Sequence, residues 1–121
     1  MSQRILIVDD EPNIVISLEY LMKKEGFQIA VATDGEAALQ QAAEFLPDLI
    51  LLDVMMPKKS GFEVCQALRA DPALAAIKVV MLTARGRETE VAKGLALGAD
   101  AYITKPFSTK DLVARIKSLL A

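Results

Sequence analysis

Five short apolar runs, each followed by a stretch in which apolar residues recur at helical spacing, divide the chain into repeated strand–helix units. The expected strands are Arg4–Val8, Phe27–Ala32, Leu49–Leu52, Lys78–Leu82 and Ala101–Thr104. Uninterrupted runs of Ile, Leu and Val are typical of parallel strands that are covered on both faces. Strands that alternate with helices through short connections predict a doubly wound α/β fold. The common strand order of such sheets is 2-1-3-4-5, which places the first and third strands side by side.

The expected helices begin and end at residues that commonly mark helix boundaries. Pro12 suits the first turn of the first helix, and Gly26 follows the expected end of that helix near Glu25. Ser108 and Asp111 resemble a capping box at the start of the last helix. The other three helices are expected from Asp34 to just before Pro47, over Gly61–Arg69, and from about Glu88 to Leu97. We therefore expect five helices packed on a five-stranded parallel sheet.

Composition limits the classes to which the chain can belong. Its 121 residues suffice for one hydrophobic core and are too few for two. The net charge of −2 makes the domain a poor electrostatic match for DNA or for an anionic membrane. Its apolar stretches fall far short of the roughly 20 residues needed to span a bilayer, and the N-terminus has no signal-peptide pattern. We expect a single cytoplasmic domain without direct nucleic-acid or membrane contacts.

The chain contains no histidine and a single cysteine, Cys65. Without histidine, catalytic triads that depend on an imidazole and His-ligated zinc sites are excluded. Cys65 lies in a helical pattern beside apolar residues, and we expect a packed thiol there, because free cysteines are commonly buried. If the protein takes part in histidine chemistry, another molecule must supply the imidazole.

Polar side chains follow four of the expected strands. Asp9 and Asp10 follow the first strand, Asp53 the third, Thr83 the fourth and Lys105 the fifth. The carboxyl ends of parallel strands share one edge of the sheet, so these side chains are expected in one pocket. Each pair of carboxylates would repel by about 4 kcal/mol at about 4 Å and an effective dielectric constant of about 20. A hard divalent cation with oxygen ligands is the natural candidate to offset that repulsion.

Five separated motifs together resemble the receiver domain of bacterial two-component response regulators. They are Asp9-Asp10-Glu11, Asp53, Met56-Pro57, Thr83-Ala84 and Lys105-Pro106-Phe107, and they appear in the family's order. The resemblance covers the whole chain and implies one receiver domain over residues 1–121, with the flavodoxin-like three-layer sandwich of that family. It implies that Asp53 accepts a phosphoryl group from a sensor histidine kinase or a phosphotransfer protein. Such a domain is not an enzyme in its own right, although it assists its own phosphotransfer and autodephosphorylation.

The resemblance also assigns roles to individual residues. Mg²⁺, with Mn²⁺ as an alternative, would be bound by Asp10, Asp53 and the backbone carbonyl of Met55 directly, and by Asp9 through water. Lys105 and Thr83 would contact phosphoryl oxygens, and the Lys105–Pro106 peptide bond resembles the family's cis bond. Thr83 and Tyr102 would form a switch, in which the aromatic side chain turns inward when the hydroxyl moves to the phosphoryl group.

Two surfaces are candidates for partner contacts. Ile16, with Val15, is expected to contact the kinase, because receivers bind kinases near the first helix. The fourth helix, fifth strand and fifth helix resemble the dimer face of winged-helix transcriptional regulators, at which Lys93, Asp100 and Arg115 match charged positions. Ala101 departs from that pattern, because the family often has a second Asp there. Homodimerisation on phosphorylation and a transcriptional output are therefore expectations, and a free-standing receiver fits equally well.

Two other classes compete with this interpretation. An aspartyl-phosphate hydrolase of similar topology typically has a second Asp two residues after the nucleophile, where this chain has Met55. A nucleotide- or flavin-binding module would need a phosphate-binding loop after the first strand, but the acidic Asp10-Glu11-Pro12 sequence repels phosphate. A receiver that acts only as a scaffold is disfavoured because every acceptor-site residue is present.

Overall fold

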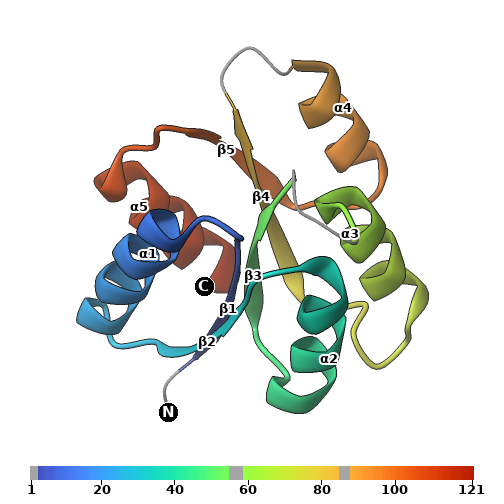
Figure 1. Ribbon diagram of the computed structural model, residues 1–121, viewed down its shortest axis with the longest axis horizontal. Coiled ribbons are helices and arrows are strands. Elements are labelled where there is room, and N and C mark those ends of the chain that lie inside the picture. The colour runs from blue at the N-terminus through green and yellow to red at the C-terminus, as the bar shows by residue number, and fades with distance from the viewer. Residues whose placement is uncertain (1–2, 55–58, 85–87) are drawn as a thin grey trace.

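The computed structural model describes residues 3–54, 59–84 and 88–121, and within them strands and helices alternate along the chain (Figure 1). The strands are β1 (Arg4–Val8), β2 (Gln28–Ala32), β3 (Leu49–Asp53), β4 (Lys78–Ala84) and β5 (Ala101–Lys105). The helices are α1 (Pro12–Lys24), α2 (Gly35–Phe45), α3 (Gly61–Ala70), α4 (Glu88–Ala96) and α5 (Thr109–Leu120). The five strands form one parallel sheet in the order β2-β1-β3-β4-β5, which confirms the predicted topology.

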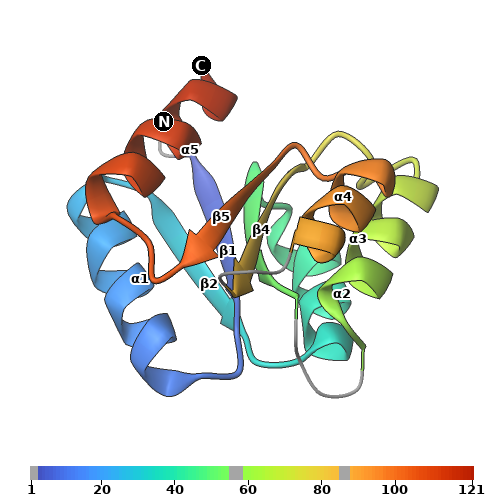
Figure 2. The ribbon, with the colours of Figure 1, turned by 90° about the horizontal axis from the view of Figure 1, so that it is seen from above.

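The sheet lies between two layers of helices. Figures 1 and 2 show α1 and α5 on one face and α2, α3 and α4 on the other. Successive residues of the central strands point to opposite faces, so Ile5 and Ile7 pack in the core under α1 and α5, whereas Leu6 and Val8 pack in the core under α2 and α3. Both faces of β1 are therefore apolar, which explains its uninterrupted Ile-Leu-Ile-Val sequence.

Three strands continue further than the sequence predicts, and the additional residues belong to the candidate site. β3 includes Asp53, which is in register with Leu82 of β4. β4 continues through Thr83 to Ala84, and β5 includes Lys105. These polar residues are thus held by the sheet itself, because strand pairing continues through their backbones.

Helix ends follow the sequence signals. Gly26 and Gly98 have φ angles of 90° and 104°, the left-handed conformation that glycine adopts without steric cost. The side chain of Ser108 accepts a hydrogen bond from the backbone N–H of Asp111, as the capping pattern predicts. Leu46, at the end of α2, is left-handed with a φ of 51° although it is not a glycine.

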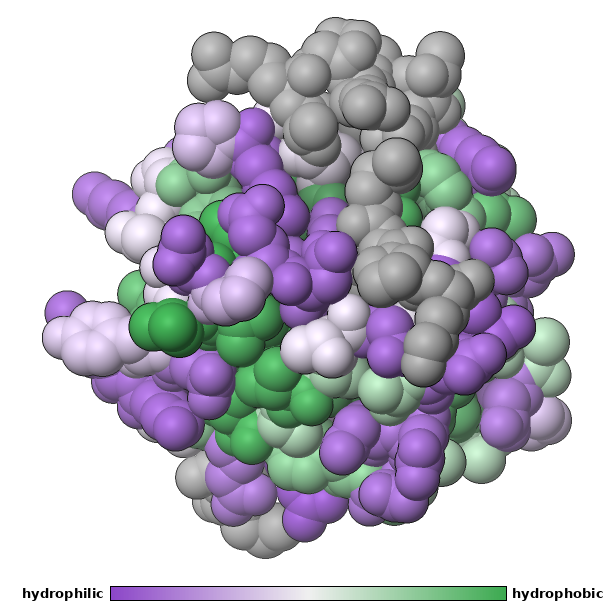
Figure 3. Space-filling model, viewed as in Figure 1, coloured by the Kyte–Doolittle hydropathy of each residue, from purple (hydrophilic) through white to green (hydrophobic). Residues whose placement is uncertain are grey.

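Apolar surface remains on several described elements. Figure 3 shows an apolar (green) area near the middle of the view, bordered by hydrophilic (purple) side chains. The large apolar side chains with the most exposure on the described residues are Ile16, Tyr20, Leu46, Leu95 and Tyr102. Among the described helices, none is long and apolar enough to cross a membrane.

Candidate functional site

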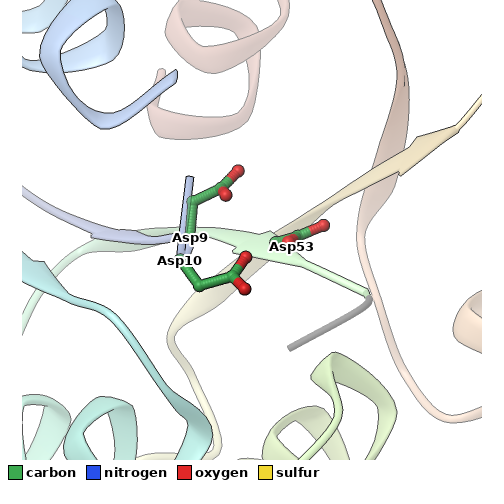
Figure 4. A group of neighbouring side chains, drawn as sticks. All are labelled: Asp9, Asp10 and Asp53. Carbon is green, nitrogen blue, oxygen red and sulfur yellow. The ribbon is translucent and has the colours of Figure 1, made fainter. Parts of the chain in front are cut away.

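Three carboxylates from two neighbouring strands lie together at the carboxyl edge of the sheet. Asp9 and Asp10 follow β1, Asp53 ends β3, and each contributes an oxygen within 4.8 Å of the other two (Figure 4). Asp9 is fully buried and Asp53 is almost fully buried, whereas Asp10 is exposed. The expected approach of Asp9 and Asp10 to Asp53 is therefore present, and it follows directly from the β1–β3 pairing.

Backbone and side-chain hydrogen bonds fix the position of Asp9. Its N–H donates to the carbonyl of Ala32 at the end of β2, over 3.2 Å. Its Oδ1 accepts the N–H of Glu11 over 2.9 Å. Because the side chain is buried and one oxygen is already bound, Oδ2 is the oxygen directed to the rest of the site.

Lys105 reaches the carboxylates from the end of β5. Its Nζ lies 2.8 Å from Asp9 Oδ2 and 3.4 Å from Asp53 Oδ1. Burial alone would lower the pKa of Lys105, but its hydrogen bond to Asp9 and the charges of Asp53 and Asp9 outweigh burial and raise the pKa above its ordinary value. Lys105 is therefore a charged ammonium in the middle of the acidic site.

Thr83 contributes a hydroxyl with unused hydrogen-bonding capacity. Its side chain is buried near the end of β4, and within the part of the chain that the structure describes Oγ1 has no hydrogen-bond partner. Leaving a buried hydroxyl unsatisfied costs about 1–3 kcal/mol. A group held in this way beside a carboxylate site is suited to donate to an anion that arrives there.

The donor set fits a hard divalent cation. Three carboxylates and one ammonium give these four side chains an excess of two negative charges, which a divalent cation balances. Mg²⁺ prefers oxygen ligands in octahedral geometry and usually takes one or two carboxylates and several waters. Asp10 and Asp53 can supply those carboxylates, and Asp9 is already bound to Lys105 and to the Glu11 N–H. Met55, whose carbonyl was expected to be a further ligand, lies outside the described residues.

The residues expected to act in the switch and in the kinase contact lie outside the cluster of carboxylates. Tyr102 lies on β5, three residues before Lys105, with 42% of its surface exposed. Ile16 on α1 is 64% exposed, as the kinase-contact hypothesis requires, but Val15 is buried at 9%. The inclusion of Val15 in that surface is wrong, because its side chain packs in the core instead of pointing outward. The Lys105–Pro106 bond is cis, as expected.

Two of the three charged residues expected on the dimer face make contacts within the domain. Lys93 Nζ lies 4.6 Å from the centre of the Phe62 ring. Asp100 Oδ2 accepts hydrogen bonds of 2.8 Å from Arg69 Nη2 and from the Val79 N–H. Sequence reasoning missed Arg69, which also donates to the carbonyls of Gly98, Ala75 and Ile77. An arginine on the last turn of a helix gives little sign that it binds residues about 30 positions away.

The sequence profile of the response regulator receiver domain matches residues 5–117. The chain belongs to this family. It is a receiver domain of the response regulators of two-component signalling, and such domains act as phosphoacceptors that interact with histidine kinases or phosphotransfer proteins. This assignment favours the phosphoacceptor over the hydrolase that the sequence left as an alternative.

Curated relatives of this receiver domain are transcriptional regulators. The chain is 47% identical over 99% of its length to the alkaline phosphatase synthesis transcriptional regulatory protein PhoP of Bacillus subtilis, covering 49% of that protein. It is 47% identical, over 99% of its length and 51% of the relative, to the DNA-binding response regulator MtrA of Mycolicibacterium smegmatis. The receiver domain thus spans about half the length of the curated relatives that it matches.

Solved structures of receivers have the same fold. A putative response regulator of Chloroflexus aurantiacus superposes with a TM-score of 0.96 at 35% identity, with 99% of this chain and 98% of that chain covered. The chemotaxis response regulator CheY4 of Vibrio cholerae superposes with a TM-score of 0.93 at 29% identity, covering 99% and 100% of the two chains. The described sheet and helices are therefore those of the receiver fold.

Proposed function

We propose that Asp53 is the residue of this receiver domain that accepts the phosphoryl group. The observation that carries this assignment is the position of Asp53 at the end of β3, within 4.8 Å of the carboxylates of Asp9 and Asp10 and 3.4 Å from Lys105 Nζ. Asp9 is already bound to Lys105 and to a backbone N–H, and Asp10 is exposed on the rim. Asp53 therefore offers a nearly buried carboxylate that is close both to the Lys105 ammonium group and to the exposed carboxylate of Asp10.

The proposed reaction is a transfer between a partner's phosphohistidine and Asp53. An Asp53 carboxylate oxygen attacks phosphorus, a P–O bond forms, and the P–N bond to the imidazole breaks with the electron pair leaving on nitrogen. Lys105 shifts from Asp9 toward a phosphoryl oxygen, and Thr83 donates its hydroxyl to another. Asp10 and Asp53 would hold Mg²⁺ or Mn²⁺, with Asp9 acting through water. The ion would neutralise charge on the transferring group.

Thr83 and Tyr102 form the proposed switch. The Thr83 hydroxyl is buried and, among the described residues, lacks a partner, so a phosphoryl oxygen would give it a hydrogen bond that the resting state does not offer. Tyr102 is partly exposed on the adjacent strand β5, where a change in packing would alter the surface. A phosphoryl group can shift the equilibrium between two conformations of the domain only through contacts that differ between those conformations. The hydrogen bond from Thr83 is such a contact.

The surface that carries the signal is proposed to be formed by α4, β5 and α5. Arg115 is exposed on α5 and is available to a partner or a second copy of the chain. Lys93 and Asp100 would first have to leave Phe62 and Arg69. Homodimerisation through this face and control of transcription are proposals, supported by the regulators that the chain resembles. The net charge of −2 argues against direct DNA contacts by this domain.

Mass spectrometry of the chain after incubation with acetyl phosphate and Mg²⁺ tests the assignment. We expect one labile phosphoryl group per chain, located at Asp53 by peptide mapping after borohydride trapping of the acyl phosphate. The variant Asp53→Asn should take up none, and omission of the metal should prevent labelling of the unsubstituted chain. A phosphoryl group at another residue would refute the assignment, and steady hydrolysis of varied phosphomonoesters would favour the hydrolase.

A further inference from the structure

Gly35, the first residue of α2, lies against the backbone of Lys59 in the connection between β3 and α3. A Cβ atom at Gly35 would overlap with the Cβ atom and the carbonyl oxygen of Lys59, and would lie 2.9 Å from its carbonyl carbon. Gly35 is buried, and its φ angle is not positive. The reason for a glycine here is therefore the close approach of another backbone, and not a conformation that side chains avoid.

Lys59 belongs to the segment that leaves the site directly after Asp53. The two ends of that segment are joined, because the Gly61 N–H donates to the Val54 carbonyl over 3.0 Å. A Cβ atom at Gly61 would overlap with the Asp53 carbonyl oxygen and lie 2.9 Å from Val54 Cα. Lys59 therefore lies two residues before a glycine whose backbone is packed against Asp53, the residue that bears the proposed acceptor carboxylate.

The other side of the contact is tied to Asp9. α2 begins just after β2, whose last residue, Ala32, accepts the N–H of Asp9. Asp34 caps α2 by accepting the Ala37 N–H over 2.8 Å, so the first turn that carries Gly35 is fixed. The Gly35–Lys59 contact therefore connects the start of α2, which follows the strand bonded to Asp9, with the residues before α3, which pack against Asp53.

We propose that Gly35 is a positioning residue for the metal site: the space left by its missing side chain sets how closely Lys59 approaches α2 and thereby the affinity for the divalent cation. This inference rests on the proposed function. An added methyl group would push Lys59 outward. Lys59 would carry the start of α3 with it, because Ser60 and Glu63 cap that helix reciprocally over 3.3 and 3.4 Å. Since Gly61 lies against the backbone of Asp53 and Val54, the displacement would be passed to these two residues.

The test is a calorimetric titration of Mg²⁺ into the unsubstituted chain and into the Gly35→Ala variant. We expect about tenfold weaker binding in the variant, a loss typical when residues that orient metal ligands are changed. Gly94→Ala is the matched control, because a Cβ atom there meets its nearest neighbour at 3.5 Å, an ordinary contact, and its affinity should equal that of the unsubstituted chain. Equal affinity in Gly35→Ala would overturn the inference.

Second-site variants at Lys59 separate the backbone contact from a general loss of stability. Lys59→Gly removes the overlapping Cβ atom and frees the backbone, so in the Gly35→Ala background it should restore part of the lost affinity. Lys59→Ala keeps the Cβ atom and should restore none; equal recovery by both would overturn the inference.

If Gly35→Ala does not fold, the Gly35→Ala/Lys59→Gly double variant is compared with Lys59→Gly alone. Weaker Mg²⁺ binding by the double variant supports the inference, and equal binding overturns it. Absence of Mg²⁺ binding by the unsubstituted chain would overturn the proposed function, and this inference with it.

Discussion

Lys105 Nζ lies closer to Asp9 than to Asp53, at 2.8 Å from Oδ2 of the former and 3.4 Å from Oδ1 of the latter. The ammonium group is thus bound chiefly to the carboxylate that is fully buried and is not the proposed acceptor. It nevertheless remains near Asp53. A movement over a short distance would bring it from one carboxylate to a phosphoryl group on the other.

Replacing Lys105 with Met should lower the free energy of unfolding in metal-free buffer at neutral pH. The expected loss is about 1–3 kcal/mol, between values typical of exposed and of buried ion pairs. The pKa of Lys105 is raised above 10.5 in the folded state. The stabilisation that Lys105 provides is therefore complete below its pKa in the unfolded chain, and it is lost as the pH rises through its pKa in the folded domain. Urea titrations of both chains should show a constant difference from pH 7 to 9 that shrinks above about pH 10.5. A difference that grows with pH would contradict this account.

Replacing Thr83 with Val should stabilise the unphosphorylated domain by about 1 kcal/mol, because it removes a buried hydroxyl that has no partner among the described residues. The same variant should still be labelled at Asp53 but should lose the surface change that follows. Urea denaturation measures the first effect and limited proteolysis of the labelled domain the second. A destabilised Thr83→Val would show that the hydroxyl already has a favourable contact in the resting state.

Replacing Tyr102 with Ala should leave labelling of Asp53 unchanged and weaken binding of the phosphorylated domain to its output partner. Tyr102 is 42% exposed and reaches the surface from the strand that carries Lys105. A titration of phosphorylated variant and unsubstituted chain against the partner measures the effect. Equal affinities would remove Tyr102 from the switch.

Replacing Ile16 with Asp should slow phosphoryl transfer from the kinase but spare labelling by acetyl phosphate. Ile16 is 64% exposed on α1, so a charge there adds little strain to the fold. Ala43→Asp places the same charge on an exposed position of α2 and should affect neither rate. If Ile16→Asp slowed both reactions equally, its effect would be on the site itself and not on kinase contact.

Replacing Arg69 with Ala should cost about 2–3 kcal/mol of stability, because charge-assisted hydrogen bonds to Asp100 and to several carbonyls are lost together. Arg69→Lys should recover little, since a single ammonium cannot replace the forked guanidinium. Arg115→Ala, an exposed arginine on α5, is the control and should change stability by less than about 0.5 kcal/mol. Thermal unfolding of the three variants distinguishes these outcomes, and a near-neutral Arg69→Ala would contradict the contacts described.

The topology and the acidic centre could be predicted from the sequence because both depend on local pattern. Each apolar run determines a strand, and strand order then brings Asp9 and Asp10 to Asp53. The expected strands ended just before Asp53, Thr83 and Lys105 because polar residues normally mark strand ends. In the structure, pairing continues through all three.

Contacts between elements that are distant along the chain could not be predicted from the sequence. Val15 was expected beside Ile16 on the surface, but the rotation of α1 on the sheet, set by packing, buries it. Asp100 matched a dimer position, yet Arg69 of α3 binds it within the domain. The need for a glycine at position 35 becomes apparent only when Lys59 is seen against it.

A calorimetric titration of Mg²⁺ into the unsubstituted chain, beside Asp10→Asn and Asp53→Asn, tests the central claim most directly. We predict one ion per chain at millimolar or lower concentration, and a much weaker affinity in each variant, because each removes one carboxylate of the three that lie within 4.8 Å. No uptake by the unsubstituted chain at millimolar Mg²⁺, or equal uptake by all three proteins, would contradict it.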